Sequence, residues 1–169
     1  MHDTHYDRLH ALLSDLDGVA QSRRYHPEGD ALYHSLQVFQ LAARQTDDVA
    51  LQAAALLHDV GKAVSGPDHD TVGAELLEGW VTPRVVWLVE HHLDLLRTPG
   101  KIRRRLRGTT QLADLERLRR WDLGGRDPSA RVCSIEDALQ RLAWSADAFL
   151  INPWPAGLTG CINELEHPC

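Results

Sequence analysis

Cysteine is scarce in this chain of 169 residues, and the three that occur lie late in it. Cys133, Cys161 and Cys169 are an odd number and form no Cys-x-x-Cys pair. Small domains that depend on disulfides carry an even set of cysteines, so we expect no disulfide framework here. The cysteine content therefore predicts a protein of the reducing cytoplasm.

Long apolar runs are also missing. No stretch approaches the roughly 18 apolar residues of a membrane span, and the opening MHDTHYDRLH has no apolar signal core. Aromatic residues make up only 6% of the chain, and most of its apolar residues are Ala, Leu and Val. We therefore expect no membrane association and a helical protein of one domain.

An excess of positive charge is absent as well, because 18 Lys and Arg face 24 Asp and Glu. A net charge of -6 argues against a protein that coats long nucleic acid. Yet 11 of the basic residues fall between Arg97 and Arg131, with four acidic ones. This segment predicts either a binding flank for a small phosphorylated ligand or a solvated helix face. The oligomeric state, including a homodimer, stays open.

Apolar residues recur at helical spacing, and no segment alternates with period two. Helices are expected over seven ranges: 4–16, 31–45, 48–60, 70–80, 83–96, 109–121 and 134–146. Gly61 is expected to end the third of them, and Pro99-Gly100 to break the chain. The sequence predicts an all-α bundle of about six to eight helices in a single domain over residues 1–169. Its core spans about 25–125, and a C-terminal helix and irregular tail occupy 130–169.

Histidine is the residue in excess, and the six of ten that lie away from the termini all fall within the first 92 residues: His26, His34, His58, His69, His91 and His92. The His58-Asp59 pair ends the most apolar predicted helix, so both side chains enter the interior. A buried carboxylate needs a charge partner or a metal ion. The alternative is a core histidine followed by an aspartate that caps the next turn.

Five further residues are candidate metal ligands of the same kind. His34 lies on a buried helix, His69 opens another, and Asp122 precedes two glycines. His91 and His92 are adjacent on a helix and diverge, so only one is expected to turn inward. Imidazole and carboxylate ligands without a thiolate suit one or two ions of Fe, Mn, Co, Ni or Mg. Together with the basic segment, they favour metal-activated water attacking a phosphate ester.

The order of these residues resembles the HD superfamily: a lone His34, HDVGK at 58–62, HDTVGAELL at 69–77, EHH at 90–92 and Asp122. The segments YHPEGDALYHSLQVFQLA (25–42) and WDLGGR (121–126) are similar to the HD domain of bacterial tRNA nucleotidyltransferases. Those domains are phosphohydrolases that act on nucleotides and 2',3'-cyclic phosphates. The resemblance therefore implies an HD-type helical domain with hydrolase activity and a small phosphorylated substrate.

The resemblance also implies a role for each matching residue. A first metal ion would be held by His34, His58, Asp59 and Asp122. A second would be held by His69 and His91, with Asp59 bridging the two ions. Asp59 and Lys62 are the expected catalytic residues. Lys62, Tyr25, Glu28 and Arg119 are the expected substrate contacts, although the Lys62 charge also suits a helix C-terminus.

Two other functions compete with hydrolysis. Tyr25-His26-Pro27-Glu28-Gly29, together with an arginine three residues before Asp122, is similar to mixed-valent di-iron oxygenases that cleave organophosphonates. Those enzymes have a lysine four residues after the fourth histidine, where this chain has Leu95 or Leu96. A non-enzymatic module that binds a nucleotide or a partner is the third interpretation.

Overall fold

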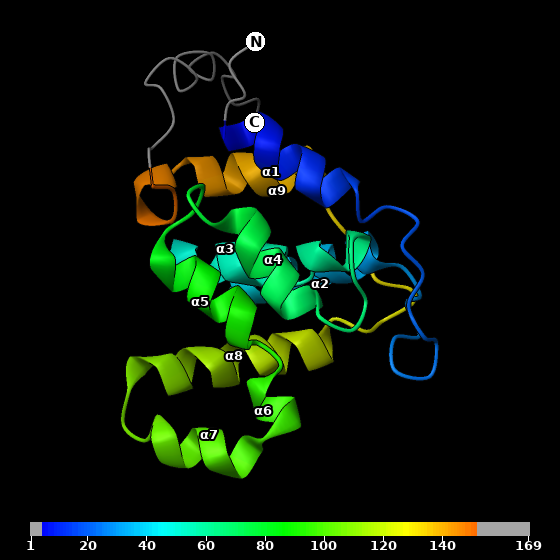
Figure 1. Cartoon of the computed structure of the whole chain (residues 1–169). Coiled ribbons are helices and arrows are strands. Elements are labelled where there is room, and N and C mark those ends of the chain that lie inside the picture. Colours follow the sequence, from blue (N-terminus) through cyan, green and yellow to red (C-terminus); the bar gives the residue numbers. More distant parts are fainter. Residues whose placement is uncertain (1–4, 152–169) are drawn as a thin grey trace, which may run out of the picture.

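The structure, a computed structural model, describes residues 5–151, whose named elements of secondary structure are all helices (Figure 1). The α-helices are α1 His5–Ser14, α2 Ala31–Gln45, α3 Val49–Leu57, α4 His69–Leu77, α5 Pro83–His91, α6 Asp94–Arg97, α7 Pro99–Arg105, α8 Thr110–Gly124 and α9 Ile135–Ala143. Two short 3-10 helices, η1 Val60–Ala63 and η2 Ala146–Ala148, complete the fold. The all-α prediction is confirmed. None of the helices described is long and apolar enough to cross a membrane.

The helices form layers around α3, which is the most buried of them. Eight of its nine residues are buried, and it packs against α2, α5 and α8. In Figure 1, α1 and α9 lie together on one side of this central layer, and α8 lies on the other side with α6 and α7. The side chains of Asp30 and Asp48 cap α2 and α3 by accepting hydrogen bonds from backbone N–H groups. The expected irregular tail after Asn152 lies outside the described residues.

Two breaks differ from the sequence-based expectation. The helix predicted over 83–96 ends at His91 and resumes at Asp94, and the Nδ1 of His92 bonds the carbonyl of Val89 at 2.6 Å. Pro99 begins α7 instead of breaking the chain. The first position of a helix suits proline, because its missing N–H would have no partner there.

Gly61 has a different role from the one predicted. Helix α3 already ends at Leu57, and Gly61 lies within η1. A Cβ atom on Gly61 would lie 2.1 Å from the carbonyl oxygen of His69 and 2.6 Å from the amide nitrogen of Gly73. Glycine is therefore required by the close packing of η1 on α4, and this packing brings Asp59 next to His69.

Candidate metal centre

Four buried imidazoles converge from different helices. They come from α2, the end of α3, the start of α4 and the end of α5: His34, His58, His69 and His92. Each has its Nδ1 within hydrogen-bonding distance of a backbone carbonyl: Gly125 (2.8 Å), Ala55 (3.0 Å), Gly66 (2.7 Å) and Val89 (2.6 Å), respectively. A carbonyl can only accept, so each Nδ1 carries a proton and each Nε2 is the atom left to bind a metal ion.

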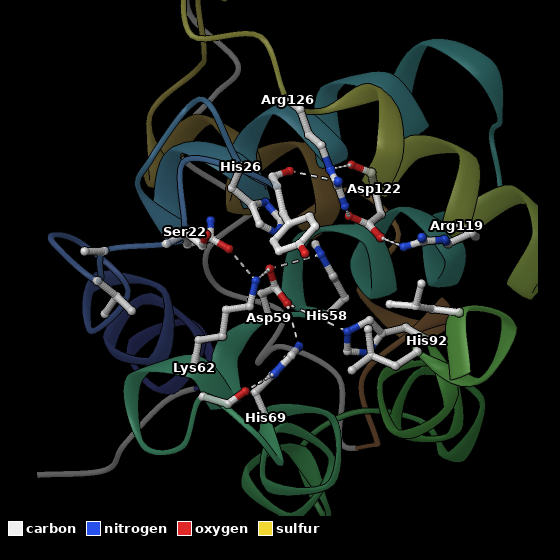
Figure 2. Close-up of a pocket in the computed structure, with 17 residues that line it drawn as sticks. Ser22, His26, His58, Asp59, Lys62, His69, His92, Arg119, Asp122 and Arg126 are labelled. Atoms are coloured by element: carbon white, nitrogen blue, oxygen red, sulfur yellow. Dashed lines mark hydrogen bonds and ion pairs between the residues drawn. The ribbon is translucent and has the colours of Figure 1, made fainter. Parts of the chain in front are cut away.

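Asp59 lies between two pairs of these rings. Its Oδ2 is 3.3 Å from the Nε2 of His58 and 3.8 Å from that of His34. Its Oδ1 is 3.3 Å from the Nε2 of His69 and 3.7 Å from that of His92. Asp122 Oδ1 lies 3.3 Å from the Nε2 of His34. The cluster therefore divides into two groups, with one oxygen of Asp59 facing each group. Figure 2 shows Asp59 between His58 and His69.

The residues of this cluster fit metal ions. The Nε2 atoms of His34, His58 and His92 are buried and have no hydrogen-bond partner. An unpaired buried polar atom costs about 1–3 kcal/mol, which a bound cation would remove. The ligand atoms are imidazole nitrogens and carboxylate oxygens, the set expected for divalent ions. The structure thus brings together His34, His58, Asp59, His69 and Asp122, as the sequence predicted.

The prediction that His91 is a metal ligand is wrong, because its side chain does not reach the cluster. His91 faces away from the cluster, with its Nδ1 3.1 Å from Asp94 Oδ2 and its ring against Trp87. His92 occupies the predicted place. Consecutive side chains on a helix point about 100° apart, so only one of the two could reach Asp59.

Replacing His92 with alanine is therefore expected to weaken binding of the second ion by about 100-fold or more. Loss of a residue that only supports a ligand already weakens metal binding by about 10- to 100-fold, and loss of a ligand itself should weaken it at least as much. The matched variant His91→Ala should keep both ions, because its ring lies outside the cluster. Elemental analysis of the two purified proteins checks this. Loss of an ion from His91→Ala alone would contradict the assignment.

The surroundings of Asp59 and Asp122 keep both carboxyl groups ionised, as metal binding requires. Burial opposes ionisation of Asp59, but the charges of His58 and Lys62 hold the pKa of its carboxyl well below the usual range. Burial likewise opposes ionisation of Asp122, yet the closeness of the His34 imidazole lowers its pKa. Both groups are therefore anions near neutral pH.

The imidazoles differ in charge before a metal binds. Burial opposes protonation of His34, but the nearby carboxylates of Asp122 and Glu28 raise its pKa to about 9. Burial and the charge of His58 lower the pKa of His92 to about 3. A metal ion must therefore displace a proton from His34, whereas His92 is already neutral.

A cavity of about 690 Å³ opens onto the cluster and carries cationic side chains on its wall (Figure 2). Lys62 Nζ lies 2.6 Å from Asp59 Oδ2 and also donates to Gln21. Arg119 Nη1 lies 2.6 Å from Asp122 Oδ2, and Arg126 Nη2 lies 3.2 Å from Asp122 Oδ1. Arg126 was missed from the sequence, although four residues after Asp122 is the spacing of ion pairs on a helix.

The two remaining predicted substrate contacts, Tyr25 and Glu28, differ in whether they reach the cavity. Tyr25 lines the cavity and is exposed, whereas the side chain of Glu28 is fully buried behind His34. Glu28 Oε1 lies 2.8 Å from His34 Nδ1 and 2.9 Å from His26 Nδ1. The prediction of Glu28 as a substrate contact is therefore wrong, because its carboxylate faces the two rings instead of the cavity.

Comparison with known proteins agrees with this geometry. The model of the HD domain family matches residues 31–142. The multifunctional CCA protein of Nitrosococcus oceani is 43% identical over 63 residues, which cover 37% of this chain and 15% of that protein. The multifunctional CCA protein of Halorhodospira halophila is 29% identical over 172 aligned positions, which cover 88% of this chain and 38% of that protein. The chain thus spans well under half the length of these relatives. The family match covers most of the chain and includes the buried histidine–aspartate cluster, so the chain belongs to the HD domain family.

Proposed function

We propose that this protein hydrolyses a phosphate ester of a small molecule, such as a nucleotide, with water as the nucleophile and one or two divalent ions as cofactor. The observation that carries the proposal is the position of Asp59, whose two oxygens face separate groups of ligands on the floor of a cationic cavity. A volume of about 690 Å³ suits a small ligand.

The residues around the cavity would have two roles in the reaction: binding the metal ions and binding the phosphoryl group. Divalent ions held by the two groups of ligands would supply Lewis-acid chemistry, lowering the pKa of bound water and offsetting phosphoryl charge. Lys62 and Arg119 would hold the phosphoryl oxygens through charge-assisted hydrogen bonds. Both side chains hydrogen-bond the cluster carboxylates, Asp59 and Asp122, so they lie at its edge.

Metal reconstitution tests the proposal. Protein stripped of metal by a chelator should release no phosphate from p-nitrophenyl phosphate or nucleoside monophosphates. Addition of Mn²⁺, Co²⁺, Ni²⁺, Fe²⁺ or Mg²⁺ should restore release, and elemental analysis should count the ions bound. A reconstituted protein that carries metal and releases no phosphate from any small ester would contradict hydrolysis.

Di-iron oxygenase chemistry is the second candidate, because the bridging position of Asp59 also suits two irons. One residue argues against it. With His92 in the cluster, the position four residues later is Leu96, which lines the cavity where those oxygenases have a lysine. Oxygen uptake by iron-loaded protein in the presence of a hydroxyalkylphosphonate, together with a mixed-valent electron paramagnetic resonance signal, would favour the oxygenase.

A further inference from the structure

Exposed apolar side chains gather at the mouth of the cavity. Tyr25 and Leu96 line the cavity and are 57% and 56% exposed, whereas Asp59 at the cluster is 1% exposed. Two of the six large apolar side chains that are exposed within residues 5–151 therefore lie at this one cavity. The apolar mouth, as we call it, consists of the five apolar or aromatic side chains that line the cavity: Val19, Ala20, Tyr25, Leu93 and Leu96.

Two segments that are distant in the sequence form the apolar mouth. The first is residues 19–25, before α2, and the second is residues 93–96, at α6. Figure 2 shows Ser22, from the first segment, and His92, which precedes the second, on either side of Asp59. A ligand whose phosphoryl group binds at the cluster therefore has its organic part between these two segments.

Both segments are fixed to the helices beside them. The backbone carbonyl of Tyr25 accepts a hydrogen bond from Arg126 Nη1 at 2.9 Å. Arg97, next to Leu96, forms an ion pair with the buried side chain of Asp70 in α4. The apolar mouth is thus formed before a ligand binds, so binding does not have to order it first.

The charged side chains of the cavity lie at the cluster instead of at the mouth. Lys62 hydrogen-bonds Asp59. Arg119 and Arg126 hydrogen-bond Asp122. Within the described part of the chain, Asp59 and Asp122 are the only carboxylates that line the cavity. An ammonium group on the organic part of a ligand would have no partner at the apolar mouth, so this surface fits an uncharged, apolar group.

Tyr25 favours a flat ring over a flexible chain as that group. The guanidinium of Arg24 lies over the Tyr25 ring, 5.3 Å from its centre, which leaves the edges and the other face of the ring for a further contact. Contact between two aromatic rings raises affinity by about 2- to 10-fold beyond the effect of buried area. A rigid ring also loses less rotational freedom on binding than an alkyl chain does.

We propose that the apolar mouth is a subsite for an aromatic ring on the alcohol side of the substrate, and that Tyr25 and Leu96 determine this specificity by contacting the ring. The inference rests on the proposed function, since it assumes that a phosphoryl group binds at the cluster. It narrows the substrate class to phosphate esters whose alcohol carries an aromatic ring, as an aryl ester or a nucleotide does.

Three phosphonates test the proposal by binding alone, because none has an ester bond to hydrolyse. Methylphosphonate has no ring, cyclohexylphosphonate has an aliphatic ring, and phenylphosphonate has an aromatic ring. Anaerobic calorimetric titration of Mn²⁺-loaded protein, at a pH where all three are dianions, should give a dissociation constant about 10-fold lower for phenylphosphonate than for methylphosphonate. Phenylphosphonate should also bind about 2-fold or more tightly than cyclohexylphosphonate, because of its contact with Tyr25.

A nucleoside 5'-phosphonate in the same series distinguishes the two sources of the ring. Its base lies farther from phosphorus than the ring of phenylphosphonate does. Binding tighter than that of phenylphosphonate would assign the subsite to a nucleotide, and weaker binding would assign it to an aryl ester.

Two variants separate apolar area from ring contact. Leu96→Ser should lower the preference for phenylphosphonate over methylphosphonate by about 3-fold. Tyr25→Leu keeps an apolar side chain but removes the ring, so the preference for phenylphosphonate over cyclohexylphosphonate should disappear. Leu123→Ser is the matched control, because Leu123 is 50% exposed and does not line the cavity. It should keep both preferences, and all three variants should keep the melting temperature, since each side chain is exposed.

The proposal would be overturned by phenylphosphonate binding no more tightly than methylphosphonate, or by a preference that Leu96→Ser keeps in full. Cyclohexylphosphonate binding as tightly as phenylphosphonate would refute the aromatic ring. Failure of the proposed function has a different signature. In that case the phosphonates would bind with the expected preferences, but the reconstituted protein would release no phosphate from any ester.

Discussion

Replacing Asp59 with asparagine is expected to lower kcat/KM for phosphate release by about 10³-fold or more, the effect of losing about 4 kcal/mol of metal-dependent stabilisation. The side chain keeps its size but loses the charge that both groups of ligands share. Its oxygens lie 3.3 Å from the Nε2 atoms of His58 and His69. Elemental analysis should therefore show that both ions bind more weakly. Steady-state kinetics at saturating metal measures the loss of activity.

A matched control for this variant is Asp114→Asn. Asp114 is also a buried carboxylate in an ion pair, its Oδ2 lying 2.7 Å from Arg84 Nη2, but neither residue belongs to the cluster or lines the cavity. Its loss should lower stability and leave metal content and kcat/KM close to those of the unaltered protein. Full activity and metal content in Asp59→Asn would refute the assignment of Asp59.

Replacing Gly61 with alanine is expected to destabilise the protein by about 3 kcal/mol and lower Tm by about 6–12 °C. The added Cβ would lie 2.1 Å from the carbonyl oxygen of His69, so α4 must move away from η1. Movement of α4 carries His69 away from Asp59. Differential scanning calorimetry measures the stability, and elemental analysis should show weaker binding of the second ion.

Gly100→Ala is the control for this second variant. Gly100 lies in α7, and a Cβ atom there would meet nothing within 4 Å. Alanine favours a helix over glycine by about 1 kcal/mol, so Tm should stay the same or rise slightly. Equal stability of Gly61→Ala and Gly100→Ala would show that the close contact between η1 and α4 can relax at no cost.

The sequence predicted much of the local structure because local rules govern it. Helix α2 spans the predicted range of 31–45, since Asp30 caps its start and its apolar face has helical spacing. The convergence of His34, His58 and Asp122 followed from their order in the chain and from the family resemblance. These features depend on residues close in sequence or on a pattern shared with other proteins.

Other features of the site depend on distant segments. Glu28 was expected to touch the substrate, but its place behind His34 depends on how the turn before α2 packs. The role of Gly61 depends on the closeness of α4, which no local pattern records. His26 and Arg126 became visible as cavity residues only when α2, η1 and α8 were placed around one space.

The sequence by itself determined the helical class, the residue types of the metal cluster and Asp59 as the residue between its two groups. Only the tertiary structure decided between His91 and His92. Both lie at the end of the same helix and are one residue apart, so their local patterns are equivalent. The interruption after α5 turns His92 toward Asp59 and leaves His91 beside Asp94. Local periodicity sets which residues form a helix, whereas the packing of one helix on another sets which side chain reaches the site.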